Sequence, residues 1–261
     1  MILLMASMKQ PLSETEPRPA GNISLLCQAG ERYLAGGQYM VAQRLLRQAE
    51  AQLWRQRDGA ALAKVYLPLL EASRLLRQQA CEGVIVISIG DDCILQRRMV
   101  EEFSRQRAGT LLLGGNAGDR WVLKMLEKVR YAARKSGYSL EALALLRSGN
   151  RWRISSTADP TFAAGLPVRW VQHPSGPEVG NTSNADEIAL PPAGIYPPGS
   201  AGATLAGESL LAAHELLALK WQSRHPVRAR RWAEMDWLRR AMRIDSACEP
   251  VLIRLLALAG G

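Results

Sequence analysis

Long apolar runs are missing from this chain of 261 residues. The apolar start, MILLMASMKQ, is too short for the core of a secretory signal or for a membrane span, and it has no basic leader. No later segment approaches twenty consecutive apolar residues. We therefore expect a soluble cytoplasmic protein without membrane contact, whose residues 1–22 are loosely held.

Cysteine and histidine are scarce and scattered. The four cysteines form no C-x-x-C pair and have no histidine at ligand spacing, which argues against a zinc site. His173 and His225 each precede a proline and are expected at turns, whereas His214 is expected inside a helix as a satisfied core group. Neither G-x-S-x-G nor H-E-x-x-H occurs. We predict no catalytic residue, metal or cofactor, and favour a protein that is not an enzyme.

Lysine is also rare, although the chain is basic. The formal charge of +9 comes from 33 basic and 24 acidic residues, and only six of the basic residues are lysine. Arginine binds phosphate and carboxylate groups in a bidentate manner, so an anionic partner is one explanation. A nucleotide-composition bias that favours arginine codons is the other, because the charge is spread along the chain.

The stretch GERYLAGGQYMVAQRLLRQA, residues 30–49, is the most informative part of the sequence. Apolar residues keep a helical period over 23–35, and Gly36-Gly37 then ends that helix. A second apolar stripe predicts another helix over 38–58. Small residues in both segments leave room for the facing backbone, so we expect two closely packed antiparallel helices.

This order of small, aromatic and bulky residues resembles the tetratricopeptide repeats, whose unit is a helix-turn-helix. The resemblance covers about fifty residues well and implies a groove that binds a peptide or a partner protein. Leu26 stands where the repeat has an early tryptophan, and no proline ends the second helix. The matching residues are Ala29, Gly30, Tyr33, Gly37, Tyr39, Ala42, Leu46 and Ala49.

Further helices are predicted at both ends of the chain. A third helix covers 59–80 and contains Pro68, and residues 239–259 resemble, more weakly, the boundary between two such repeats. Because one repeat cannot bury its own apolar face, the two ends either pack together as one split solenoid or form separate caps. The C-terminal helices are predicted over 205–222, 226–243 and 250–259.

The middle of the chain reads as an α/β segment. GVIVISIGDD and GTLLLGG are continuous apolar runs typical of buried parallel strands. A helix is predicted over 92–107, and a long helical segment that starts at the Asp119 cap is predicted over 120–147, with a break near Ser136-Gly137. Alternating segments then suggest antiparallel or edge strands, and a Pro/Gly-rich loop with one short strand follows. The fold class is α+β, with repeat-like hairpins at both ends around a small, partly parallel sheet. The predicted units are 1–22, 23–82, 83–172, 173–204 and 205–261.

Two sets of residues are candidates for function. Arg32, Gln38, Gln43 and Arg47 flank the small residues of the first hairpin and are the candidate partner-binding set for the favoured function, a noncatalytic interaction or scaffold module. A third possibility is nucleic acid or another anionic partner on the arginine-rich segment RHPVRARRWAEMDWLRRAMRID.

The alternative to an interaction module is an enzyme that binds a nucleotide or a metal at the carboxyl ends of the first two strands. Ligands of open α/β sheets lie at such ends. The candidate residues are Asp91, Asp92, Gly114, Gly115 and Gly118, although the loop GGNAGD lacks the lysine of a phosphate loop.

Overall fold

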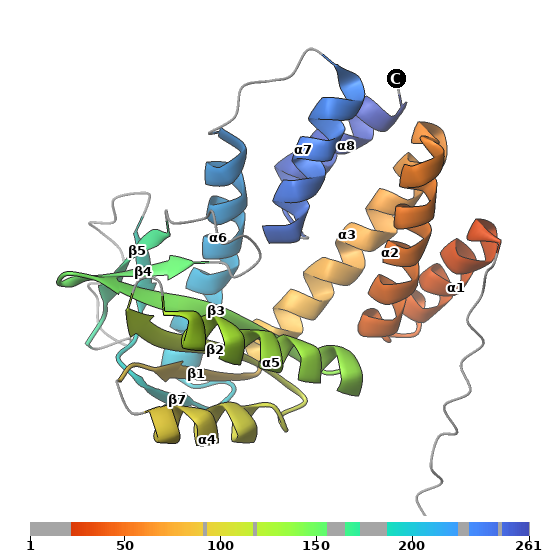
Figure 1. Ribbon diagram of the computed structural model, residues 1–261. Coiled ribbons are helices and arrows are strands. Elements are labelled where there is room, and N and C mark those ends of the chain that lie inside the picture. The colour runs from red at the N-terminus through yellow and green to blue at the C-terminus, as the bar shows by residue number, and fades with distance from the viewer. Residues whose placement is uncertain are drawn as a thin grey trace, which may run out of the picture.

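The computed structural model describes residues 22–90, 93–116, 119–155, 165–172, 187–223, 230–244 and 247–260. These residues form a mixed α/β protein with eight helices and a seven-stranded sheet (Figure 1). The helices are α1 (Ile23–Ala35), α2 (Tyr39–Gln56), α3 (Gly59–Glu82), α4 (Cys93–Phe103), α5 (Arg120–Ser136), α6 (Ala201–Ser223), α7 (Arg231–Ile244) and α8 (Glu249–Gly260). The strands are β1 (Val84–Ser88), β2 (Ala108–Asn116), β3 (Ser139–Ser148), β4 (Arg151–Ser155), β5 (Leu166–Trp170), β6 (Ile188–Leu190) and β7 (Gly194–Tyr196).

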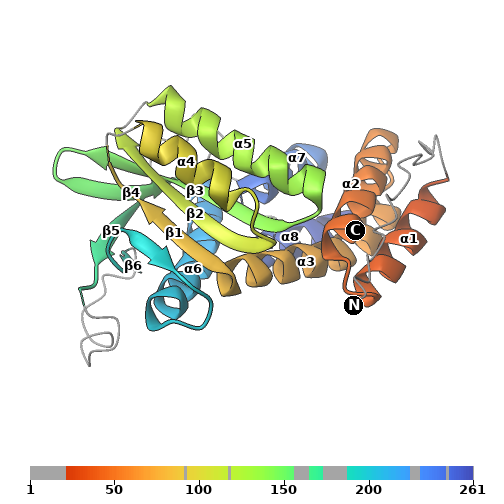
Figure 2. The same ribbon diagram turned by 90° about the horizontal axis from the view of Figure 1, so that it is seen from below.

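The sheet has the order β6-β5-β4-β3-β2-β1-β7. Its centre, β1, β2 and β3, is parallel, whereas β4 is antiparallel to β3, β5 to β4, and β7 to β1. At one edge β6 is parallel to β5. Helices α4 and α5 cover one face of the sheet, and α3 and α6 lie on the other (Figure 2). The central strands are therefore buried on both faces, which explains their continuous apolar sequences.

The first two helices pack closely because small residues lie between them. A Cβ atom added at Gly30 would come within 2.7 Å of the Leu46 side chain, and Ala42 and Ala49 are fully buried. Gly37 has a φ of 74° at the turn, a conformation that favours glycine. These residues place α2 against both α1 and α3.

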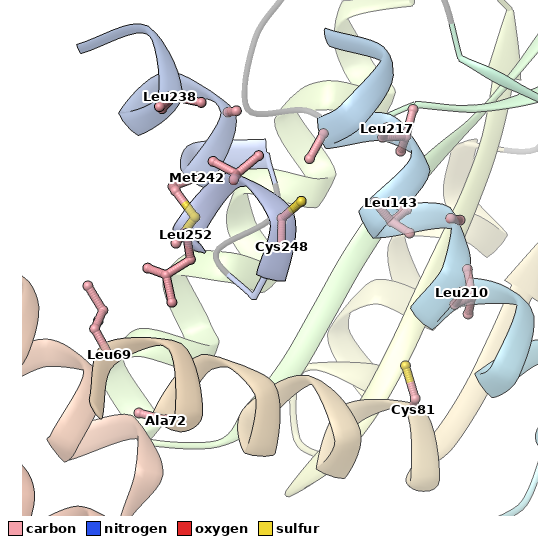
Figure 3. Packing of buried hydrophobic residues seen from close by; sticks show 14 of the residues in the cluster. Leu69, Ala72, Cys81, Leu143, Leu210, Leu217, Leu238, Met242, Cys248 and Leu252 are labelled. Carbon is pink, nitrogen blue, oxygen red and sulfur yellow. The ribbon is translucent and has the colours of Figure 1, made fainter. Parts of the chain in front are cut away.

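One continuous core joins the two ends of the chain to the sheet. It contains buried side chains from α1, α2 and α3, from α6, α7 and α8, and from one face of the sheet. Figure 3 shows the part of this core that lies between α3, α6, α7 and α8. Leu69 of α3, Leu252 of α8 and Leu210 of α6 are members. A second cluster lies under α4 and α5 on the opposite face.

A buried ion pair also crosses between the ends of the chain. Arg239 of α7 donates two hydrogen bonds to the carboxylate of Glu50 in α2, at 2.6 and 2.9 Å. The Arg239 guanidinium lies 4.7 Å from the centroid of the Trp54 ring, and Trp54 meets Trp232 edge to face at 5.4 Å. This cluster fixes α7 against α2, although 189 residues separate Glu50 from Arg239.

Two sequence-based expectations for the middle segment are wrong. Helix α5 ends at Gly137, which has a φ of 70°, where the sequence predicts a break, but residues 139–148 form strand β3 and not the second part of a helical segment. The segment SLEALALL has helix-forming residues, but both faces of β3 are buried in the parallel sheet, and tertiary burial overrides local propensity. Residues 187–202 contain two short strands, β6 and β7, where one was expected. Over the described ranges, each helix is either too short or too polar to cross a membrane.

Candidate functional site: a basic groove between α2 and α5

A groove with a volume of about 680 Å³ runs between α2 and the C-terminal end of α5. Both ribbon views show that end of α5 beside α2 (Figures 1 and 2). This α2–α5 groove lies near the amino ends of the parallel strands, because α5 leads directly into the start of β3. It is lined by Met40, Val41, Gln43, Arg44, Arg47, Gln48, Ala51, Arg134, Lys135, Ser136 and Gly137.

Helix α2 supplies one wall of the groove through its amphipathic pattern. Its fully buried positions 42, 46 and 49 face α1 and α3. The groove positions 40, 41, 44, 47, 48 and 51 recur at helical spacing on another side of the same helix. The same periodicity that builds the hairpin therefore presents a second, partly polar face to α5.

Helix α5 supplies the other wall. The Asp119 side chain accepts a hydrogen bond from the Trp121 N–H at 2.9 Å and caps its N-terminus, as the sequence predicts. At the other end, the Gly137 N–H bonds to the Ala133 carbonyl and the chain turns into β3. Arg134 and Lys135 are exposed in this last turn, where the helix dipole favours positive charge.

The groove combines positive charge with apolar surface. Arg44 and Arg47 of α2 face the groove together with Arg134 and Lys135 of α5. No carboxylate occurs among its described lining residues. The apolar part comes chiefly from α2, where Met40, Val41 and Ala51 lie beside the arginines. The groove therefore brings cationic and apolar side chains together on one concave surface.

A side pocket of about 200 Å³ adjoins the groove. The two share Met40, Gln43 and Arg134, and the side pocket also contacts α3 and the first residues of β3. Its polar walls are held by internal hydrogen bonds, since Gln43 donates to the Ser73 hydroxyl at 2.8 Å. The remaining lining residues are Ser73, Leu76, Arg130, Ala133, Ser139, Leu140 and Glu141.

Glu141 forms a charged cluster at the inner end of the side pocket. One carboxylate oxygen lies 3.4 Å from Arg77 Nε and the other lies 2.6 Å from His214 Nε2. Arg77 and His214 are buried, whereas the Glu141 side chain is 25 % exposed and reaches the pocket. Burial acts to raise the pKa of Glu141, but the charges of His214, Arg77 and Arg130 outweigh it and lower that pKa below its usual range.

The cluster fixes α3, β3 and α6 relative to one another. His214 lies in a helix and in the core, as the sequence predicts, and its contact is with this carboxylate. Burial, followed by the charge of Glu141, raises the pKa of the nearby Cys81 thiol to about 12, so this thiol is protonated at neutral pH. The groove and the side pocket themselves present side chains that can form ion pairs, hydrogen bonds and apolar contacts.

The structure brings together two of the four predicted partner-binding residues. Gln43 and Arg47 line the groove. Gln38 is exposed just before α2, and Arg32 is exposed on α1, where its Nε donates to the Gln28 carbonyl at 3.4 Å. Neither Gln38 nor Arg32 is a lining residue of the groove.

The second predicted set lies at the opposite ends of the strands. Asp91, Asp92 and Gly118 are outside the described residues. Gly114 and Gly115 lie near the end of β2, where an added Cβ would come within 2.9 Å of the Ser88 carbonyl oxygen or 2.4 Å of Val122, respectively.

Glycine at these two positions therefore allows neighbouring parts of the chain to pack closely. Gln96 spans the same ends and donates to the carbonyls of Gly90 and Gly114, at 2.9 and 3.0 Å.

Several arginines of the C-terminal segment make contacts within the chain. Arg239 pairs with Glu50, Arg240 pairs with Asp236 at 3.1 Å, and Arg231 donates to the last carbonyls of α8. Met235, Leu238 and Met242 of the same helix, α7, are buried. His225 and residues 224–229 lie outside the described residues, as does His173.

Sequence reasoning missed Arg44, Arg130, Arg134, Lys135 and Glu141. The basic pair at the end of α5 is visible in the sequence, but it is also what an ordinary helix C-terminus contains. Nothing local indicates that α5 ends beside α2. The available signal for Glu141 is a charged residue at the start of a buried strand, and the helix-forming composition of that segment hides it.

Comparisons with known proteins assign no function to this chain, so the residues described above carry the argument. Among the described residues, no group of three or more His, Cys, Asp or Glu side chains is placed to hold a metal ion. A scan against models of protein families, a search of curated proteins and a search of solved structures each find no match to this chain.

Proposed function

We propose that the protein is a noncatalytic interaction module that binds a segment of a partner protein in the α2–α5 groove. The observation that carries the proposal is the groove itself, about 680 Å³ in volume, in which apolar Met40, Val41 and Ala51 lie beside charged side chains. Peptide sites commonly combine apolar contacts with a few polar groups that fix orientation and register.

The tetratricopeptide-like character of α1 and α2 is part of the same proposal. The close contact of Gly30 with Leu46 and the burial of Ala42 support it. The resemblance implies a helical framework that presents a partner-binding surface. The groove differs from an isolated repeat because α5, outside the hairpin, forms one of its walls.

The direct test is selection of peptides from a random dodecapeptide display library on the full chain. Ala51→Trp places a large ring in the groove, whereas Ala60→Trp, a matched control, adds the same ring at an exposed position in the first turn of α3. Selected peptides should lose binding to Ala51→Trp and keep it to Ala60→Trp. Failure to select any peptide, or equal binding by both variants, contradicts the proposal.

An enzyme that uses a nucleotide at the ends of β1 and β2 is the alternative, and thermal stability separates it from a peptide-binding module. A ligand at one hundred times its dissociation constant stabilises a fold by about 2.7 kcal/mol. We expect no such shift from magnesium with a panel of nucleotides. A reproducible shift that is abolished by Asp91→Asn or Asp92→Asn would favour the enzyme.

A further inference from the structure

A cluster of aromatic and cationic side chains lies where α2 ends and α7 begins, at one end of the helical layer (Figure 1). Trp54 meets Trp232 edge to face, with ring centroids 5.4 Å apart. The guanidinium of Arg57 lies 4.7 Å from the Trp232 centroid and 5.8 Å from the Trp54 centroid. Arg231 lies 5.8 Å from the Trp232 centroid. Both rings are half-buried and both arginines are exposed, so these four residues form what we call the Trp–Arg surface.

The backbone at Arg57 favours a role for its side chain. Arg57 follows α2 with a φ of 59°, in the left-handed region where a helix commonly ends on glycine. In the described part of the chain, every other residue with a positive φ is a glycine. Arginine in this conformation carries a strain that glycine would not. Its retention here is explained by what the guanidinium contacts.

The guanidinium of Arg57 has hydrogen-bonding capacity that the fold does not use. Over the described ranges, its contacts are with the two tryptophan rings, and its N–H groups have no acceptor. Arg230, the exposed residue before α7, likewise has no carboxylate partner among the described residues. Arg231 donates to the last carbonyls of α8, which leaves its positive charge unpaired by a carboxylate.

The carboxylates near this surface are engaged with other groups. Asp58 accepts a hydrogen bond from the Ala61 N–H at 3.0 Å and caps α3. The other two are in ion pairs, Glu50 with Arg239 and Glu234 with Arg254. Asp58 therefore offsets at most one of the three arginine charges at positions 57, 230 and 231, and positive charge remains in excess.

Aromatic rings beside arginines with free N–H groups favour a single-stranded nucleic acid as the ligand. Unpaired bases stack on aromatic rings and on guanidinium planes, and arginine N–H groups bind phosphate oxygens. A duplex keeps its bases stacked inside, and a phosphorylated peptide uses arginines but needs no aromatic platform. The two tryptophans therefore separate this surface from a site for phosphate alone.

We infer that the Trp–Arg surface binds single-stranded nucleic acid, with a base stacked against Arg57 and the tryptophan rings and with phosphates bound by Arg57 and Arg230. This inference goes beyond the proposed function, because none of these residues lines the α2–α5 groove. The salt dependence that such contacts produce makes it measurable.

The test measures the affinity of the full chain for a fluorescein-labelled thymidine 20-mer by fluorescence anisotropy, from about 50 to about 200 mM salt. Arg57→Gly removes the guanidinium at a position whose φ suits glycine, so its melting temperature should stay close to that of wild type. It should bind about five- to tenfold more weakly. The slope of log affinity against log salt should also become shallower by about 0.7, the loss of one phosphate contact.

Two control variants and a second ligand complete the test. Arg98→Gln removes one exposed charge from α4, and Ala51→Trp fills the α2–α5 groove; both should bind the 20-mer as wild type does. An abasic 20-mer, which has the phosphates but no bases, should bind wild type at least about fivefold more weakly than the thymidine 20-mer.

Each contrary result overturns the inference in its own way. No binding at about 50 mM salt, or unchanged binding by Arg57→Gly, removes the site. Equal weakening by Arg98→Gln shows an effect of net charge, and lost binding in Ala51→Trp places the nucleic acid in the groove. Equal affinity for the abasic 20-mer leaves a contact with phosphate alone. Because none of these measurements uses peptides, the proposed function is tested separately.

Discussion

Replacing Arg239 with leucine should destabilise the protein strongly, because it leaves the carboxylate of Glu50 buried without its partner. The Glu50 side chain is 5 % exposed and the Arg239 side chain 23 %. Removing one member of a buried pair lowers the free energy of unfolding by about 3–5 kcal/mol. Because Arg239 is partly exposed, we expect a loss of about 3 kcal/mol here. In a chain of this size each kcal/mol corresponds to about 2–4 °C, so the melting temperature should fall by about 6–12 °C.

Circular dichroism during thermal and urea unfolding measures the effect, with Arg240→Leu as the matched control. Arg240 is the next residue in α7, and its pair with Asp236 is exposed on both sides, so its loss should cost at most about 1 kcal/mol. A Glu50→Leu/Arg239→Leu double variant should recover much of the stability, because no charge is left buried. Equal losses in Arg239→Leu and Arg240→Leu would refute the claim that this pair fixes α7 against α2.

Two further substitutions test the packing and the charged cluster. Gly30→Ala should lower the free energy of unfolding, measured by urea denaturation, by about 1–3 kcal/mol, because its Cβ would lie 2.7 Å from Leu46. In the control Gly36→Ala the nearest atom would be 3.4 Å from the new Cβ, so the loss should be less than about 1 kcal/mol. Similar losses in both variants would contradict the claim that Gly30 is needed for the close approach of α1 and α2. Glu141→Gln should cost about 2–3 kcal/mol at pH 7. Burial alone acts to raise the pKa of Glu141, but the surrounding charges lower it in the fold, so its stabilisation is present above the unfolded pKa of about 4.3 and is lost as the pH falls. The difference in unfolding free energy between Glu141→Gln and wild type should therefore be smaller at pH 3 than at pH 7. The control Glu71→Gln removes an exposed ion pair and should remain within about 1 kcal/mol of wild type at both pH values. A difference for Glu141→Gln that does not depend on pH would contradict the assignment of Glu141 as an ionised, stabilising carboxylate.

Local sequence signals predicted most of the helices and the two central strands β1 and β2. The bounds of α1 follow from the apolar period and from Gly36-Gly37, and the Asp119 cap marks the start of α5. The runs VIVIS and TLLLG identify β1 and β2, because strands buried on both faces need apolar residues at every position.

The remainder depends on contacts between distant segments. Strand β3 has the composition of a helix, and only its position between β2 and β4 determines its conformation. Strand β7 is a three-residue segment in a Pro/Gly-rich region that pairs with the edge of β1. The local sequence of β3 favours a helix and that of β7 favours a loop, so neither strand can be recognised without its pairing partner.

The candidate site was predicted only in part for the same reason. Gln43 and Arg47 were identified because they flank the packing residues of α2. Their neighbours Arg134 and Lys135 lie about ninety residues further along the chain, in a helix whose end is placed by the sheet. A groove between two elements cannot be inferred from the periodicity of either one alone.

The most direct test of the account is an NMR titration of the ¹⁵N-labelled full chain with a peptide selected on the wild type. The account predicts chemical-shift changes concentrated in residues 40–51 of α2 and 133–137 at the end of α5, with none at residues 88–90 and 114–116. Changes confined to the carboxyl ends of β1 and β2, or to α1, would contradict the assignment of the groove as the binding site.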